Sequence, residues 1–92
     1  MTTEEFIARC RNHVLTIAKL ILAKYGLDVN VQPTDIQLVW YSKALRNYKC
    51  IMFIPILKDG HIYECTYNGD KEEFYVDAYK KVSHTVFPLV NG

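Results

Sequence analysis

Cys10 and His13 are the residues of this sequence whose types and spacing most directly suggest metal chemistry. In a helical run, side chains three positions apart project from the same side of the helix, and a thiol and an imidazole so placed can bind one zinc ion. Structural zinc sites use four protein ligands, and no second ligand pair of this kind accompanies the first. We therefore expect a buried thiol beside a half-exposed imidazole, with no metal and no cofactor.

Nucleophilic catalysis has little support in the sequence. A Cys–His pair would require the two side chains to be close in space, and neither His61 nor His84 has an obvious carboxylate to orient it. The motifs G-x-S-x-G and H-E-x-x-H and a paired-acid motif are all missing. We expect a protein that is not an enzyme, and a small enzyme built on Cys10 and His13 is the weakest alternative.

The stretch YNGDKEEFYVDAYKK, residues 67–81, raises the question of a phosphate-binding loop. Phosphate loops need several glycines and a lysine placed to meet the anion, whereas this stretch contains Gly69 alone. An arriving phosphate would also meet the negative charges of Asp70, Glu72 and Glu73. Asp70 and Glu73 match a capping box, so we expect the start of a helix.

The turn KALRNYK, residues 43–49, combines cations with aromatic rings. Lys43, Arg46 and Lys49 lie close to Tyr41 and Tyr48, a pattern found in surfaces that bind nucleic acids or acidic proteins. The net charge of only +1 and the pI of about 7.7 favour an ordinary solvated turn. Nucleic-acid binding through this turn is therefore the alternative function.

Length and composition predict one domain over residues 1–92. The chain is 50% hydrophobic, which is enough for one core. Cys10, Cys50 and Cys65 are odd in number and widely spaced, as is typical of reduced thiols in the cytoplasm. The first 26 residues begin with acids, and basic residues interrupt the apolar ones, which argues against a signal peptide and a membrane span. We expect a cytoplasmic protein without membrane contact.

Two helices are expected. Apolar residues recur at helical spacing over Thr3–Tyr25, where Thr2 and Glu5 form a capping-box pattern and Gly26 suits the residue after the helix. The second helix should span Lys71–Val86. Its buried stripe would consist of Tyr75, Ala78, Tyr79, Val82 and Val86.

Three strands are expected between these helices. β-Branched and aromatic residues predict strands at Ile36–Lys43, Tyr48–Leu57 and Ile62–Tyr67. Asp59–Gly60 suggests a two-residue hairpin turn. The sequence therefore predicts an α+β fold of order α-β-β-β-α, with a three-stranded antiparallel sheet and two helices.

The expected hairpin turn assigns side chains to the two sheet faces. A turn at Asp59–Gly60 sets Leu57 opposite Ile62. If the first hairpin has a four-residue turn, Trp40 and Leu38 join the same face. This second face would carry Ile51, Phe53, Pro55, Leu57, Ile62, Glu64 and Thr66.

Two helices can cover one face of a small sheet, and the second face is still apolar. Its centre would be formed by Trp40, Ile51, Phe53 and Ile62. Monomers rarely expose a contiguous apolar patch of more than a few hundred Å², so we expect a homodimer or a different protein to cover it. The alternative is that the first helix or the segment of residues 27–32 folds over this face.

A resemblance to a known family rests on motifs already described. The chain resembles a small family of uncharacterised proteins from phages and prophages of Gram-positive bacteria in the run WYSK (residues 40–43), the turn LRNYK (45–49), the run YECTYNGDK (63–71) and the run DAYKK (77–81). No activity is established for that family, so it supplies no catalytic residues. The resemblance implies a small cytoplasmic protein of a bacterial host, made during infection or carried by a prophage.

The expected function is therefore a non-enzymatic protein-binding module, of the class that takes over host proteins or inhibits host defence. This class assignment is an analogy from the resemblance. The residues expected to contact a host or phage protein, or a second copy of the chain, are Trp40, Tyr41, Lys43, Arg46, Tyr48, Lys49, Ile51, Phe53 and Ile62.

Overall fold

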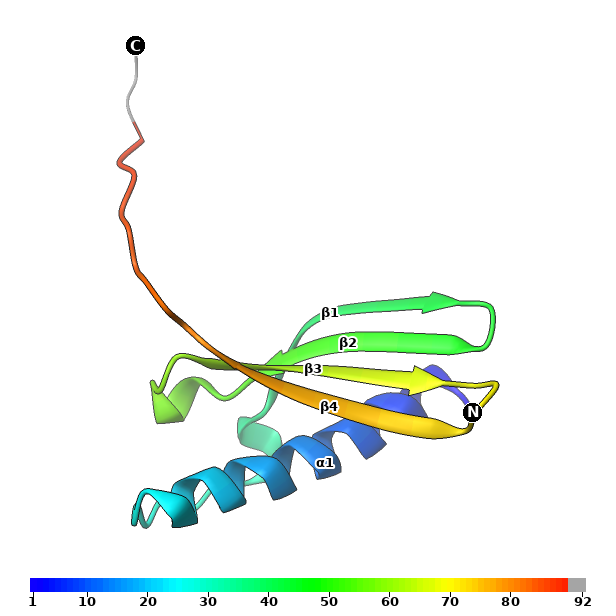
Figure 1. The fold of residues 1–92 in the computed structure, drawn as a ribbon, viewed down its shortest axis with the longest axis horizontal. Helices are drawn as coiled ribbons and strands as arrows, with labels where there is room; N and C mark the ends of the chain where they lie inside the picture. The colour runs from blue at the N-terminus through cyan, green and yellow to red at the C-terminus, as the bar shows by residue number, and fades with distance from the viewer. Residues whose placement is uncertain (90–92) are drawn as a thin grey trace.

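A computed structural model describes residues 1–89 as one helix packed on a four-stranded antiparallel sheet (Figure 1). The strands lie in the order β1-β2-β3-β4, so that each pairs with its neighbour in the chain. The regular elements are α1 (Thr3–Lys24), β1 (Gln37–Ala44), β2 (Asn47–Phe53), β3 (His61–Asn68) and β4 (Glu73–Lys80). Short 3₁₀ turns at Pro33–Asp35 and Pro55–Leu57 precede β1 and β3.

The expected first helix is confirmed, together with both of its caps. The Thr2 hydroxyl accepts a hydrogen bond from the Glu5 amide (3.1 Å), which satisfies one of the free amides of the first turn. Gly26 follows α1 with φ of 66°, the left-handed conformation that glycine adopts at low cost. None of the helices formed by residues 1–89 combines the length and the apolar character that a membrane span requires.

The expected second helix is wrong, and so is the three-stranded sheet. Residues 73–80 form β4, which pairs with β3 from Asn68↔Glu73 to His61↔Lys80, and residues 81–89 have no regular structure. The fold is still α+β, with one helix and four strands.

The segment of β4 satisfies both periodicities, which explains the error. Tyr75 and Tyr79 are four positions apart, as on a helix, but Phe74 and Val76 also alternate with Tyr75 and Asp77, as on a strand. Strand pairing wins because it saturates the open edge of β3 and places Phe74 against the ring of Tyr67 (centroids 4.8 Å apart).

The acidic turn before β4 is a hairpin loop and not a helix start. The side-chain oxygen of Asn68 accepts hydrogen bonds from the amides of Asp70 (3.1 Å) and Lys71 (3.2 Å), and Glu72 adopts a positive φ of 53°. Asn68 thus caps the loop as an Asx turn, and the expected capping box between Asp70 and Glu73 is wrong.

The register between β2 and β3 also differs from expectation. Phe53 pairs with Ile62, whereas the expected two-residue turn would have paired Leu57 with Ile62. Strand β2 ends at Phe53, and the connection is a longer loop in which Pro55 begins a 3₁₀ turn and Lys58 has a left-handed conformation. The shift is an even number of residues, so the paired side chains of β2 and β3 stay on the faces that were predicted for them. The prediction is wrong for Ile56, which is 50% exposed, and for Leu57, which packs against the core.

The first hairpin matches the expected register only near its turn. Lys43 pairs with Tyr48 and Trp40 with Ile51, but a bulge after Leu38 shifts the remaining pairs by one residue. Leu38 therefore pairs with Met52 and lies on the helix side, not beside Trp40.

The core lies between α1 and the inner face of the sheet. Phe6 is its aromatic centre, with its ring 5.1 Å from Tyr48, 6.0 Å from Tyr41 and 6.1 Å from Phe74 (centroid distances). The fully buried side chains below it include Cys10, Val14, Cys50, Met52, Tyr63 and Cys65. The aromatic rings and the apolar stripe of α1 thus hold the helix on one face of the sheet.

Gly69 allows two hairpin turns to approach closely. A Cβ atom at this position would lie 2.2 Å from the carbonyl oxygen of Arg46, and the Gly69 amide donates a hydrogen bond to the Asn47 side chain (3.2 Å). The β1–β2 and β3–β4 turns are in contact here because Gly69 lacks a side chain.

We predict that Gly69→Ala lowers the free energy of unfolding by about 1–3 kcal/mol, as overpacked sites do. The measurement is urea unfolding followed by circular dichroism. Gly26→Ala is the comparison, since its new Cβ would meet no atom within 4 Å and it adds backbone strain alone. An unchanged unfolding midpoint for Gly69→Ala would contradict the close approach.

Candidate functional site

The outer face of the sheet is open in the described part of the chain. Helix α1 lies along the inner face, and the strands β1 to β4 present the other face to solvent (Figure 1). Trp40, Phe53 and Ile62 are 47%, 37% and 43% exposed. The expected alternative, in which the first helix or residues 27–32 cover this face, is not what the structure has, since Val31 is buried in the core.

The pairing registers arrange the outer face in rows across the strands. One row joins Phe53, Ile62 and Tyr79 through their pairings in β2, β3 and β4. The next row joins Trp40 and Ile51. Because neighbours in a row lie within contact distance, these five side chains form one continuous patch, here called the outer apolar patch.

The row that contains Trp40 and Ile51 continues across β3 and β4 with two carboxylates, which border the outer apolar patch. Ile51 pairs with Glu64, and Glu64 pairs with Asp77 on β4. The ammonium group of Lys49 lies 3.0 Å from the carboxylate of Glu64, whereas Asp77 has no cation within salt-bridge distance among residues 1–89. The outer face is therefore apolar at one end and has an acidic centre.

Two of the expected contact residues lie on the inner face instead. Tyr48 is buried, and its hydroxyl donates a hydrogen bond to the carbonyl oxygen of Met1 (2.6 Å). Tyr41 is half-buried beside Phe6, and its hydroxyl is 2.8 Å from that of Thr3. Both tyrosines thus hold the N-terminal end of α1 on the sheet.

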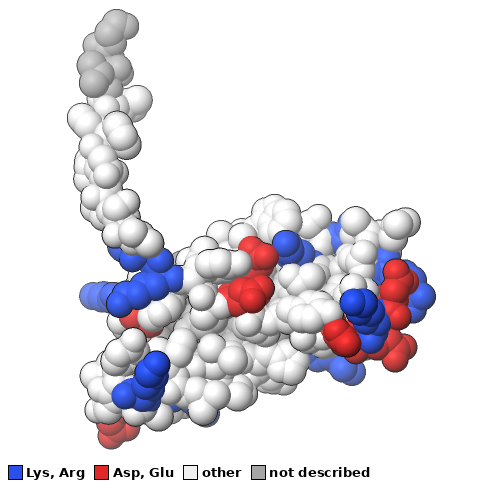
Figure 2. All heavy atoms as spheres, in the orientation of Figure 1, with Lys and Arg blue, Asp and Glu red and all other residues white. Residues whose placement is uncertain are grey.

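The cations of the basic turn are engaged within the chain. Arg46 donates to the carbonyl oxygen of Gly69 (3.0 Å) and lies 3.4 Å from the Asp70 carboxylate. Lys43 stacks over the Tyr48 ring, 5.1 Å from its centroid, and Lys49 is paired with Glu64. On the face seen in Figure 2, basic side chains form separate small groups and no continuous basic stripe.

A pocket of about 350 Å³ opens beside the C-terminal end of α1. Its walls are mostly apolar, and Asp59 and His61 are among the residues that line it. The Asp59 carboxylate accepts a hydrogen bond from the backbone amide of His61 (3.1 Å). Its other oxygen lies 2.8 Å from the Nδ1 atom of His61. Histidine is a common proton-transfer group, but the pocket lining includes no serine, threonine or cysteine, so a Ser-, Thr- or Cys-based nucleophilic site is missing there.

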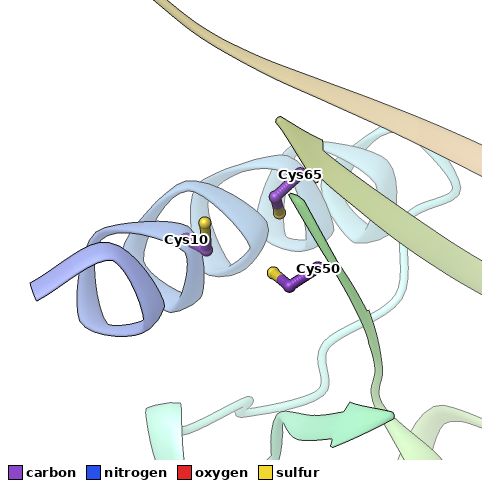
Figure 3. Close-up of side chains that lie close together, drawn as sticks. All are labelled: Cys10, Cys50 and Cys65. Atoms are coloured by element: carbon purple, nitrogen blue, oxygen red, sulfur yellow. The ribbon is translucent and has the colours of Figure 1, made fainter. Parts of the chain in front are cut away.

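Three thiols converge in the core, which sequence reasoning did not predict. Cys10 of α1, Cys50 of β2 and Cys65 of β3 point toward one another (Figure 3), and their sulfur atoms all lie within 4.8 Å of one another. All three are free and have no exposed surface. Cys10 therefore lies beside Cys50 and Cys65 and does not form a pair with His13. The His13 ring packs against the Phe74 ring instead, with the two ring centroids 5.2 Å apart.

The thiols differ in acidity because they interact with one another. Interaction with Cys50 and then Cys65, together with burial, raises the pKa of the Cys10 thiol. Hydrogen bonding from Cys10 and Cys65 lowers the pKa of Cys50 to about 4, against the effect of burial, and the Arg11 charge adds to this. Cys10 lowers the pKa of Cys65, but Cys50 and burial outweigh it and raise the pKa to about 12. The three thiols therefore influence one another's ionisation.

The sequence contained a usable signal for this cluster. Cys10 lies in the apolar stripe of the first helix, and Cys50 and Cys65 lie at inward-facing positions of adjacent strands. Cys10 meets the Cys50–Cys65 pair only because of where α1 packs on the sheet. The packing position of a helix on a sheet cannot be read from the periodicity of the sequence.

The family model described as "Family of unknown function (DUF6275)" matches residues 7–89. The chain belongs to this family. The match covers α1 from Ile7 onward and all four strands. No curated protein and no solved structure matches the chain.

Tyr63 supplies a prediction about the polar edge of the core. Its hydroxyl is buried and has no hydrogen-bond partner among residues 1–89. Because an unpaired buried hydroxyl is costly, we expect Tyr63→Phe to raise the free energy of unfolding by about 1 kcal/mol. Tyr25→Phe, at an exposed position, should change nothing. A loss of stability in Tyr63→Phe, measured by urea unfolding, would indicate that the hydroxyl is satisfied.

The same residue predicts a dependence on pH. Burial, and then the negative charge of Asp59, raise the pKa of Tyr63 above its usual 10.0. As the pH rises, the Tyr63 hydroxyl loses its proton in the unfolded chain before it does so in the folded chain. The contribution of the protonated hydroxyl to stability is therefore complete below pH 10 and is lost as the pH rises through the pKa of the folded state. Wild type should therefore lose more stability than Tyr63→Phe between pH 9 and 11. Parallel curves for the two proteins would refute this.

Proposed function

We propose that this protein is a non-enzymatic protein-binding module that uses the outer apolar patch. The observation that carries the proposal is an open sheet face on which Trp40, Phe53 and Ile62 are all substantially exposed. Apolar side chains gathered in adjacent rows cost free energy in water, and large aromatic residues are the usual anchors of protein interfaces.

The charges beside the outer apolar patch define the chemistry of the partner. Glu64 and Asp77 are neighbours, and Lys49 pairs with Glu64. A second copy docked face to face would bring further carboxylates toward this acidic centre. A different protein with an apolar surface and a lysine or arginine opposite Asp77 fits the face better, because buried charges need a partner.

The segment of residues 81–89 extends the proposed binding surface. The Lys81 amide donates to the Gly60 carbonyl oxygen (2.8 Å), and beyond it the chain leads away from the sheet (Figure 1). Val82, Phe87 and Leu89 are almost fully exposed. An apolar segment without contacts of its own can pack on a partner and become ordered there, at an entropic cost.

Nucleic-acid binding has less support from the same geometry. Such binding depends mainly on cations that are free to neutralise phosphates. Arg46 and Lys49 each have a carboxylate partner, and Tyr48 is buried and cannot stack with a base. Binding to a protein therefore accounts for these surface features better than binding to a nucleic acid.

We further propose that the partner is a protein of a bacterial host, and that the module acts in its cytoplasm as a phage or prophage product that inhibits a host or defence protein. This part of the proposal is supported by the sequence resemblance of residues 39–81 to phage and prophage proteins. The open face supplies the physical means, since an inhibitor needs a rigid surface and no catalytic group.

The test substitutes one residue at the centre of the outer apolar patch. Ile62→Asp should abolish capture of a host protein by the immobilised full chain, because an aspartate buried in the contact would stay unpaired. Leu20→Asp is the matched control: Leu20 is 64% exposed on α1, away from the patch, and its substitution should leave capture intact. Circular dichroism verifies the fold of both variants.

Three outcomes would contradict the proposal. Capture that is equal for wild type and Ile62→Asp would exclude the outer apolar patch as the contact. A dimer in light scattering that Ile62→Asp converts to a monomer would assign the patch to a second copy. Retardation of DNA or RNA that weakens with salt and is lost in Arg46→Glu would favour the nucleic-acid alternative.

A further inference from the structure

The cysteine cluster joins the three central elements of the fold. Cys50 and Cys65 are direct partners in the β2–β3 pairing, and Cys10 reaches them from α1. Cysteine is often buried simply as a small apolar residue, which would place each thiol independently of the others. Here three side chains from three elements direct their sulfur atoms into one space (Figure 3).

The separations of the sulfur atoms suit a metal ion. Metal–thiolate bonds of about 2.3 Å place three sulfur ligands about 4 Å apart around a trigonal ion. The three sulfur atoms here are already within 4.8 Å of one another. Small side-chain rotations that shorten each S–S separation by less than about 1 Å would therefore bring all three sulfur atoms to metal-binding distance. We propose that Cys10, Cys50 and Cys65 form a binding site for a soft, thiophilic metal ion of the copper(I) class.

The composition of the donor set argues for this class of metal. The group contains three thiols, and no histidine, aspartate or glutamate of the described residues joins it. Structural zinc sites are closed by four ligands, whereas soft thiolate donors select ions such as copper(I). Hard ions such as Mg²⁺ and Ca²⁺ require oxygen ligands, which this site lacks.

Proton and charge balance set the conditions for binding. Each coordinating thiol releases its proton to water as the metal–sulfur bond forms. Three thiolates around a monovalent ion leave excess negative charge, which the neighbouring Arg11 offsets in part. The site has no exposed surface, so the ion enters as α1 docks on the sheet or during a transient opening of that contact. The bound ion would then link α1 to β2 and β3.

The test uses the full-length reduced protein under anaerobic conditions. Copper(I) is titrated against a competing chromogenic chelator, and native mass spectrometry counts the bound ions. We expect one ion per chain and a higher melting temperature in its presence. Cys10→Ser, Cys50→Ser and Cys65→Ser should each weaken binding by at least about 100-fold, since outer-shell partners alone account for about 10–100-fold.

Control variants separate the site from general thiol binding. His13→Ala should bind copper(I) as wild type does, because His13 is directed to Phe74 and not to the cluster. Circular dichroism identifies any serine variant that fails to fold. For such a variant, the melting-temperature shift with copper(I) in Cys10→Ala, Cys50→Ala and Cys65→Ala is the second readout, and it should vanish in each.

Several results would overturn the inference. Wild-type affinity no higher than that of a variant lacking one cysteine would leave the thiols as packing groups. Tighter binding of zinc than of copper(I) would reject the metal class, and dependence on His13 would reject the ligand set. All readouts are independent of partner capture, so this inference and the proposed function can fail separately.

Discussion

The packing of a single amphipathic helix on a four-stranded sheet is the constraint from which the other features follow. A helix is about 10–12 Å wide, whereas four strands spaced about 4.8 Å apart form a wider surface. Helix α1 therefore buries the central inner side chains of β2 and β3, which are Cys50, Met52, Tyr63 and Cys65. The outer face receives no cover from residues 1–89, and its apolar rows are exposed.

The same helix–sheet contact brings the cysteines together. The thiols of Cys10, Cys50 and Cys65 meet inside this interface, and the rings of Tyr48 and Phe74 pack around Phe6 near the start of α1. The fold thus separates two chemistries: thiols lie in the core beneath α1, and aromatic and acidic groups lie on the face without a helix.

Much of this fold could be predicted from local patterns, and the errors have identifiable causes. Helix α1 and the first three strands follow from periodicity, and the paired residues of β2 and β3 keep their predicted faces because the register error between these strands is an even number of residues. The bulge in β1 moves Leu38 to the other face. The error at β4 arose because its tyrosines fit helical and strand spacing equally well. The strand conformation is preferred because the edge of β3 is free to pair with this segment. The presence of a free strand edge cannot be recognised from a short stretch of sequence.

The sequence by itself determined the caps of α1, the apolar stripe on that helix and the alternation that directs large apolar side chains of β2 and β3 to the outer face of the sheet. These depend on neighbours within a few residues, where propensity and side-chain period act directly. Only the tertiary structure decided that β4 completes the sheet, that Tyr48 faces inward, that Arg46 pairs with Asp70, and that three distant cysteines meet. These contacts join residues far apart in the chain, and the packing of α1 against β2 and β3 and the pairing of β3 with β4 establish the distances between them.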